Sequence, residues 1–174
     1  MSLKELIEEL EKLPKDETIQ VSYYIIDYCI KKKYSITNLK LNKLLYFSNI
    51  EYMLNNNGKP LFKEEFEAWR HGPVLKSVYE TFCMGIGKAT EEKLNLIIDN
   101  LKDNKINSIN KVLDEKAGLD AFKLVELTHI KNGPWELIYN TNKDKNGICT
   151  ANIPNKKIYD FYKENRNAIQ DNKC

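Results

Sequence analysis

The chain has 174 residues, a formal net charge of +2 at pH 7, and 42% hydrophobic against 30% charged residues. A chain of this size forms one ordinary domain and buries roughly 70% of the surface that its unfolded form exposes, so it needs no disulfide or metal to stay folded. Its four cysteines are widely separated, include no CxxC pair and follow no secretory segment. We therefore expect reduced thiols and a cytoplasmic location.

Hydropathy and charge exclude two classes of partner. No apolar run approaches the ~20 residues that a membrane-spanning helix requires, so no membrane is expected. Basic and acidic residues are interleaved, so the chain lacks the field of one sign that dedicated nucleic-acid binders carry, and nucleic acid is not expected either. Only Arg70 and Arg166 interrupt a set of cations that is otherwise all lysine. Because guanidinium gives bidentate pairing that ammonium cannot, Arg70 draws most attention.

Helix signals are clear in the first third of the chain. Ser2-Leu3-Lys4-Glu5 is a capping box, and we treat residues 1–17 as an N-terminal helical arm. Apolar spacing predicts a second helix from Thr18 to Lys32. A third helix is capped by Thr37 and ends at Asn55-Asn56-Asn57-Gly58, residues that tolerate a left-handed exit. The side of it expected to be buried comprises Leu41, Leu44, Leu45, Ser48 and Tyr52.

The helical period fails after Pro60. A short extended piece, Glu65 to Arg70, is predicted there. Pro73 then occupies the first position of a fourth helix, where its missing N–H costs nothing. Tyr79 lies on the apolar face predicted for this helix, and Gly85 ends it.

The rest of the chain is predicted to be helical, with a polar loop at Asn140 to Asn146. Two of the expected helices span Thr90 to Asn100 and Ile109 to Lys116. Three more follow, the first capped by Asp120, the second beginning at Pro134 and the third at Pro154. The residues of the last helix that are expected to face the core are Ile158, Phe161, Tyr162 and Ile169. We predict a mostly α fold: a single compact multi-helix domain over residues 18–174, including the C-terminal helix, with at most a small β element near residues 62–70.

Two matched clusters hold both tryptophans and both histidines. They are Trp69-Arg70-His71-Gly72-Pro73 and His129-Ile130-Lys131-Asn132-Gly133-Pro134-Trp135. In each, a Gly-Pro step lies beside an aromatic ring and an imidazole. The sequence therefore predicts one structural element used twice, a corner at which Gly-Pro opens a helix.

Two non-catalytic interpretations of these clusters stay open. In the structural one, each imidazole holds a backbone carbonyl or hydroxyl, Thr128 and His129 are a local hydrogen-bonding pair, and the tryptophans lie in the core. In the binding one, the two corners frame a groove for a polypeptide, because tryptophan, tyrosine and arginine most often carry binding energy at interfaces. The candidate partner-binding residues are Trp69, Arg70, His71, Thr128, His129 and Trp135.

A catalytic interpretation would use His71 and His129 as base and acid, or as metal ligands with Glu67. No HExxH, GxSxG, Walker-type or paired-carboxylate signature accompanies them. We therefore expect no enzyme, no catalytic residue, no metal and no cofactor.

Several motifs resemble a known family in order and spacing. They are Leu39-Lys40-Leu41-Asn42-Lys43-Leu44-Leu45-Tyr46, Gly58-Lys59-Pro60-Leu61-Phe62, Phe66-Glu67-Ala68-Trp69-Arg70-His71-Gly72-Pro73-Val74, Val78-Tyr79, Leu127-Thr128-His129 and Gly133-Pro134-Trp135. From about Thr18 to Tyr162 the chain resembles the Panacea domain, also called the SocA-like or phage-associated GepA-like domain. His71 departs from the pattern, since an aromatic such as tyrosine is common there.

The resemblance implies an antitoxin of a bacterial or prophage toxin–antitoxin pair, which neutralises a cognate toxin by direct protein–protein binding. It implies a cytoplasmic, non-enzymatic protein whose toxin is encoded by an adjacent gene. One branch of the family acts instead as an adaptor that delivers its toxin to a ClpXP-type protease, and here Asn165 to Cys174 would offer the second contact. The resemblance identifies neither the toxin nor the interface residues.

Overall fold

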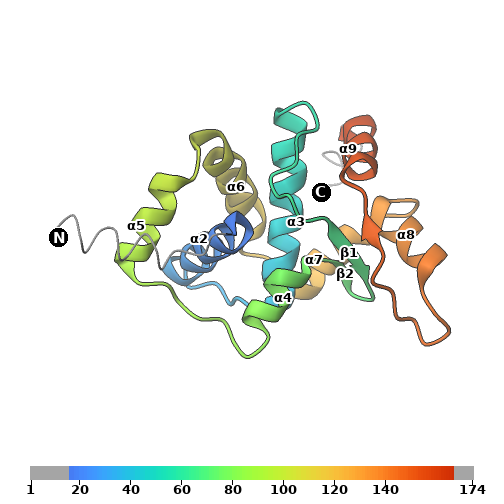
Figure 1. Ribbon diagram of the computed structural model, residues 1–174, viewed down its shortest axis with the longest axis horizontal. Helices are drawn as coiled ribbons and strands as arrows, with labels where there is room; N and C mark the ends of the chain where they lie inside the picture. The colour runs from blue at the N-terminus through green and yellow to red at the C-terminus, as the bar shows by residue number, and fades with distance from the viewer. Residues whose placement is uncertain (1–15, 167–174) are drawn as a thin grey trace.

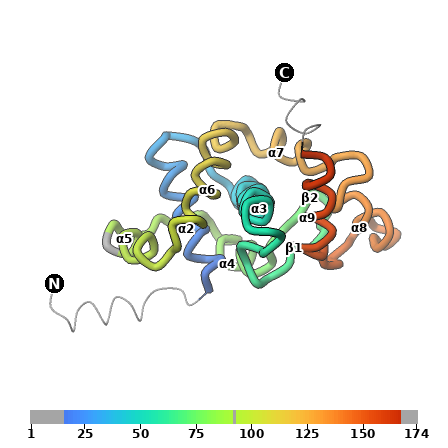
Figure 2. Tube along the Cα trace, turned by 90° about the horizontal axis from the view of Figure 1, so that it is seen from above, coloured from blue at the N-terminus to red at the C-terminus, as the bar shows by residue number. Residues whose placement is uncertain are grey.

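Helix α3 (Asn38–Asn55) is the central element of the fold. The computed structural model describes residues 16–166, and α3 runs through the middle of them (Figure 1), with the other elements arranged around it when the view is along the helix (Figure 2). One side holds α2 (Glu17–Lys31), α5 (Glu91–Asn100) and α6 (Asp103–Lys116), and the other holds the sheet, α8 (Pro134–Asn142) and α9 (Asn155–Glu164). Two shorter helices, α4 (Lys76–Phe82) and α7 (Ala121–Thr128), also pack against α3. The mostly α architecture predicted from the sequence is confirmed.

Both ends of α3 form as the sequence predicts. The Thr37 hydroxyl accepts a hydrogen bond from the Lys40 N–H at 3.2 Å, and Asn57 and Gly58 take positive φ angles just after the helix. The burial of α3 is wider than predicted, because polar residues between the apolar ones are also enclosed. Besides the predicted residues, the buried set includes Lys40, Asn42, Lys43, Tyr46, Phe47, Asn49, Ile50 and Met53.

The buried polar side chains of α3 bind backbone groups of the segment that follows it. Asn42 Oδ1 accepts from the N–H of Leu75 at 2.8 Å, and Asn49 Oδ1 accepts from the N–H of Leu61 at 2.8 Å. Lys43 Nζ donates to the carbonyl oxygen of Pro73 at 2.7 Å. A buried backbone group without a partner costs free energy, so these side chains replace bonds that a helix or sheet would otherwise supply.

The sheet is small and antiparallel, with strand order β2-β1-β3. Its strands are β1 (Phe66–Trp69), β2 (Gly72–Val74) and β3 (Asn152–Ile153). Trp69 pairs with Gly72, so Arg70 and His71 form the turn of a two-residue hairpin. The extended piece predicted over Glu65 to Arg70 is confirmed as β1, whereas β2 and β3 were not predicted.

The prediction that Pro73 opens a helix is wrong. Pro73 lies in β2, and α4 begins only at Lys76. An edge strand tolerates proline because one row of its N–H groups has no strand partner, and the bonds from α3 hold residues 73 and 75 in the extended conformation. Tyr79 of α4 was predicted to face the core but is 42% exposed. By contrast, Pro134 does occupy the first turn of α8, so the two Gly-Pro steps build different structures.

Smaller differences concern element boundaries. Glu17 belongs to α2, which Asp16 caps, and α6 begins at Asp103, earlier than predicted. α8 extends to Asn142, into the predicted loop, while Pro154 directly precedes α9 as expected. The first 15 residues of the predicted arm, and Ile169, lie outside the described residues. Between residues 16 and 166, no helix combines the length and the hydropathy needed to cross a membrane.

The Asn49 side chain offers a test of the bonds made by α3. Its amide also donates to Asn155 Oδ1 at 3.1 Å, so Asn49→Ala leaves a buried N–H of Leu61 without its acceptor. We expect a loss of about 1–3 kcal/mol in the free energy of unfolding, measured by urea denaturation. Asn55→Ala on the exposed end of the same helix is the matched control, with a change within about 0.5 kcal/mol. Equal urea midpoints for Asn49→Ala and Asn55→Ala would refute the stabilising role that we assign to the bond from Leu61 to Asn49.

Candidate partner-binding site

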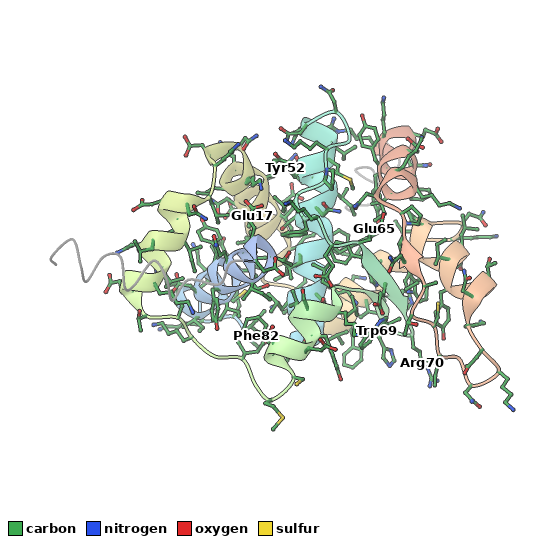
Figure 3. The ribbon with its side chains drawn as sticks, in the orientation of Figure 1. Glu17, Tyr52, Glu65, Trp69, Arg70 and Phe82 are labelled. Carbon is green, nitrogen blue, oxygen red and sulfur yellow. The ribbon has the colours of Figure 1, made fainter. Side chains whose placement is uncertain are left out.

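The first cluster forms the exposed end of the β1–β2 hairpin, which we call the hairpin tip (Trp69, Arg70 and His71). Arg70 and His71 are exposed and Trp69 is half-buried. The Trp69 indole donates to Glu67 Oε2 at 2.7 Å, and its ring meets Tyr79 edge-on, with centroids 4.8 Å apart. Figure 3 shows Trp69 and Arg70 together at this end of the hairpin. The tip therefore presents an aromatic pair next to a guanidinium.

The second cluster lies against the hairpin and forms a supporting layer (Thr128, His129 and Trp135). Thr128 ends α7, His129 caps it, and Trp135 lies in the first turn of α8. The His129 imidazole stacks on the Trp135 indole, with centroids 3.7 Å apart and planes 1° apart. Thr128 and Trp135 are buried and His129 is half-buried, so this layer contributes packing more than surface.

The two clusters meet, although they lie far apart in the sequence. The Trp135 indole donates to the carbonyl oxygen of Trp69 at 2.8 Å. At Gly72, a Cβ atom would lie 2.7 Å from Thr128 Oγ1 and 2.9 Å from Lys43 Cε, and φ is +97°. Only glycine fits such a position. The structure thus brings all six predicted residues into one region, three at the tip and three in the supporting layer.

Lys43 is a member of this region that sequence reasoning missed. Its side chain is completely buried beneath β2, and burial lowers its pKa from 10.5 to about 7. Its hydrogen-bond partner is the neutral carbonyl of Pro73, so no carboxylate of the described chain offsets the cost of burying a charge. The signal that could have revealed this buried lysine is its position between Asn42 and Leu44, in a helix without an exposed side.

His129 shares the electrostatic environment of Lys43. Burial lowers the pKa of the His129 imidazole, and the charges of Lys43 and His71 lower it further, against an opposing effect of Glu136. Its Nε2 atom is buried without a hydrogen-bond partner among the described residues. The imidazole is therefore neutral at pH 7, and aromatic stacking holds it. Within residues 16–166, no three His, Cys, Asp or Glu side chains are grouped so as to hold a metal ion.

A loop beside the hairpin tip was also missed. Trp69 and Arg70 line one side of a pocket of about 310 Å³, and residues 146–150 line the other. Ile148, in this loop, is 62% exposed. The sequence predicted only a polar loop ending at Asn146, and nothing in its composition marked the isoleucine as exposed.

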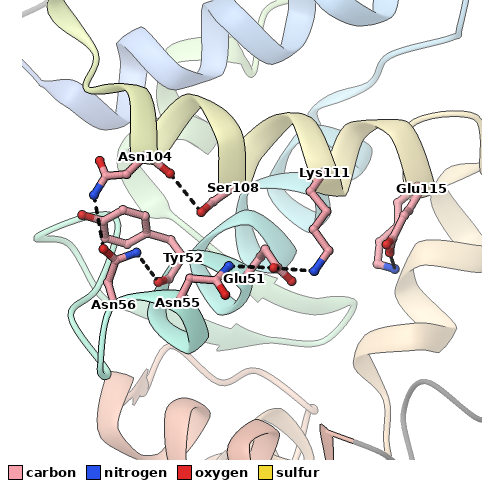
Figure 4. Close-up of polar contacts among 9 residues, drawn as sticks. Glu51, Tyr52, Asn55, Asn56, Asn104, Ser108, Lys111 and Glu115 are labelled. Atoms are coloured by element: carbon pink, nitrogen blue, oxygen red, sulfur yellow. Dashed lines mark hydrogen bonds and ion pairs between the residues drawn. The ribbon is translucent and has the colours of Figure 1, made fainter.

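A second hollow, between α3 and α6, is polar and internally satisfied. It has a volume of about 370 Å³. Glu51 Oε1 accepts from Asn55 Nδ2 at 2.7 Å and from Lys111 Nζ at 2.6 Å, while Asn104 donates to Asn56 at 3.2 Å (Figure 4). Because these groups bond to one another, they join α3 to α6 and leave few free groups for a ligand. Arg70 differs, since it makes no hydrogen bond or ion pair with the part of the chain that the structure describes.

Comparisons with known proteins place this region in a family. The model of the family described as "Antitoxin SocA-like, Panacea domain" matches residues 41–136, which span both clusters and most of α3. The protein named Antitoxin SocA of Caulobacter vibrioides (strain NA1000 / CB15N) is 32% identical over 130 residues, which cover 69% of this chain and 69% of that protein. No solved structure matches. The chain belongs to the SocA-like Panacea domain family, as the motifs predicted.

The buried lysine predicts a pH-dependent stability. Between pH 7 and 10.5 the unfolded chain binds more protons at residue 43 than the folded chain does, so stability rises with pH, by at most about 1.4 kcal/mol per unit. Lys43→Met should remove this rise, seen in urea unfolding at several pH values between those limits. The exposed Lys59→Met is the matched control and should keep the wild-type slope. A variant at residue 43 with the wild-type slope would show that Lys43 is charged in the folded protein.

Proposed function

We propose that this chain is an antitoxin that neutralises a cognate toxin by direct protein–protein binding in the cytoplasm, with the hairpin tip at the centre of the contact. Membership of an antitoxin family and the name of the Caulobacter relative support the antitoxin role. The single observation that supports the location is the unpaired Arg70 guanidinium, exposed beside the Trp69–Tyr79 pair. A guanidinium held at an exposed turn is available for a carboxylate of a partner.

The composition and rigidity of the tip suit such a contact. Tryptophan, tyrosine and arginine are the side chains that most often dominate binding energy at interfaces. The bonds from Lys43 to Pro73 and from Trp135 to Trp69 hold the hairpin in place before binding. Little ordering is then needed on association, which leaves more of the contact energy as affinity. Thr128, His129 and Trp135 act in this proposal by supporting the tip.

Neutralisation by this route requires no chemistry. A rigid domain that covers the active site of a toxin, or holds the toxin in an inactive conformation, needs only a stable complex. We therefore propose a non-enzymatic protein without cofactor, whose partner is the product of an adjacent gene.

Co-expression tests the proposal. The chain is expressed with the product of the neighbouring gene, and both growth rescue and co-purification are scored. We expect rescue and a stoichiometric complex, and Arg70→Ala should weaken the complex by about tenfold or more. Arg166→Ala, at the only other arginine of the sequence, is the matched control and should bind as the wild type does.

The other outcomes separate the parts of the proposal. Unchanged affinity of a folded Arg70→Ala variant would place the interface elsewhere. Rescue with disappearance of the toxin, dependent on a host protease, would favour the adaptor role. Its expected second contact, Asn165 to Cys174, lies outside the described residues from residue 167 onward. The absence of both a complex and growth rescue would refute direct neutralisation of that gene product.

A further inference from the structure

The pocket beside the hairpin tip opens where the β1–β3 pairing ends. The N–H of Ala68 still bonds to the carbonyl oxygen of Ala151 at 2.8 Å. Beyond that bond the two segments separate, and the pocket of about 310 Å³ lies between Trp69 and Arg70 on one side and residues 146–150 on the other. Ligand pockets commonly run from about 300 to 1,000 Å³, so this one suits a large side chain better than a cofactor.

The loop that forms the far wall is held in place by hydrogen bonds to its backbone groups. Asp144 Oδ1 accepts from the N–H groups of Asn146 and Ile148, each at 2.8 Å, and the Asp144 N–H donates to the Ile148 carbonyl at 2.8 Å. The Tyr139 hydroxyl donates to the carbonyl of Gly147, whose φ is +76°. These bonds hold Ile148 at the surface with 62% of its area exposed. A fixed, exposed isoleucine costs little ordering on contact with a partner.

The charged side chain that lines the pocket, Arg70, is a cation. Glu67 already accepts from the Trp69 indole, and Asp144 accepts from its own loop. Arg70 has no partner in the described chain, and Lys145, next to the pocket-lining Asn146, is exposed. Apolar walls beside a free guanidinium are complementary to an apolar side chain that has a carboxylate nearby.

We propose that this pocket receives an aliphatic or aromatic side chain of a protein partner, and that Arg70 pairs with an Asp or Glu next to that side chain. This inference rests on the proposed function and names the chemistry of the partner's contact segment. A single-stranded nucleic acid would instead need a line of cations along the surface. The carboxylates of Glu67 and Asp144 interrupt any such line here.

The first test uses peptides and does not require the toxin. The chain has two tryptophans, so a nitrogen–proton NMR spectrum shows two indole N–H signals. The signal that disappears in Trp135→Phe belongs to Trp135, which assigns the other to Trp69. The probe is acetyl-Asp-Leu-Asp amide at millimolar concentration. We expect the Trp69 indole signal to shift with this peptide. The matched peptides acetyl-Lys-Leu-Lys amide and acetyl-Asp-Gly-Asp amide should bind about tenfold more weakly or not at all.

Paired variants locate the binding. Arg70→Gln should weaken binding of the acidic peptide about tenfold, and Arg166→Gln should leave this binding unchanged. Ile148→Asp should weaken binding of this peptide similarly. Ile98→Asp, at a residue of α5 that is 39% exposed and lies at the other end of the molecule, should not. Both test residues are exposed, so these variants keep the fold. No shift with acetyl-Asp-Leu-Asp amide, equal shifts with the lysine peptide, or an Arg70-dependent shift with a short RNA instead would overturn the inference.

The same variants in the co-expression complex separate this inference from the proposed function. If the wild type binds the neighbouring gene product and Ile148→Asp binds it equally well, the pocket is not the contact and the antitoxin function stands. If the acidic peptide binds but no complex with that product forms, the pocket chemistry stands and the proposed neutralisation fails.

Discussion

The central constraint on this structure is that three buried polar side chains of α3 bind backbone groups of another segment. Asn42, Lys43 and Asn49 bind residues 75, 73 and 61, in the stretch that contains β1 and β2. An apolar α3 would leave those backbone groups buried without partners. The hairpin tip therefore has its position set by a helix about thirty residues earlier in the chain.

Lys43 shows what this arrangement costs. Its aliphatic stem packs in the core as an apolar side chain would, and its nitrogen reaches the Pro73 carbonyl. The same burial disfavours the ammonium form and brings its pKa to about 7. Natural proteins depart from an apolar core mainly where function requires it. Here the departure lies directly beneath the surface that we propose for binding, which ties the two features together.

Sequence reasoning predicted most helices because their signals are local. The Thr37 and Asp120 caps and the Pro134 helix start need no knowledge of the rest of the fold. Pro73 was misassigned because a Gly-Pro step resembles a helix start, while the groups that make it a strand come from α3. The exposure of Tyr79 and Ile148 also depends on tertiary packing. The binding interpretation placed the two clusters around one groove, but their division into tip and support was not predicted.

This division allows the proposed contact surface to vary independently of the fold. Arg70 and His71 form a turn held by strand pairing, and Ile148 lies in a loop held by Asp144, so these exposed side chains contribute little to holding their own backbone. Gly72 and the supporting layer are different, because they pack against one another with no spare space. Substitutions at Arg70, His71 or Ile148 should therefore alter the surface that we propose for binding at little cost in stability. Substitutions at Gly72 or beneath it change the position of the whole tip.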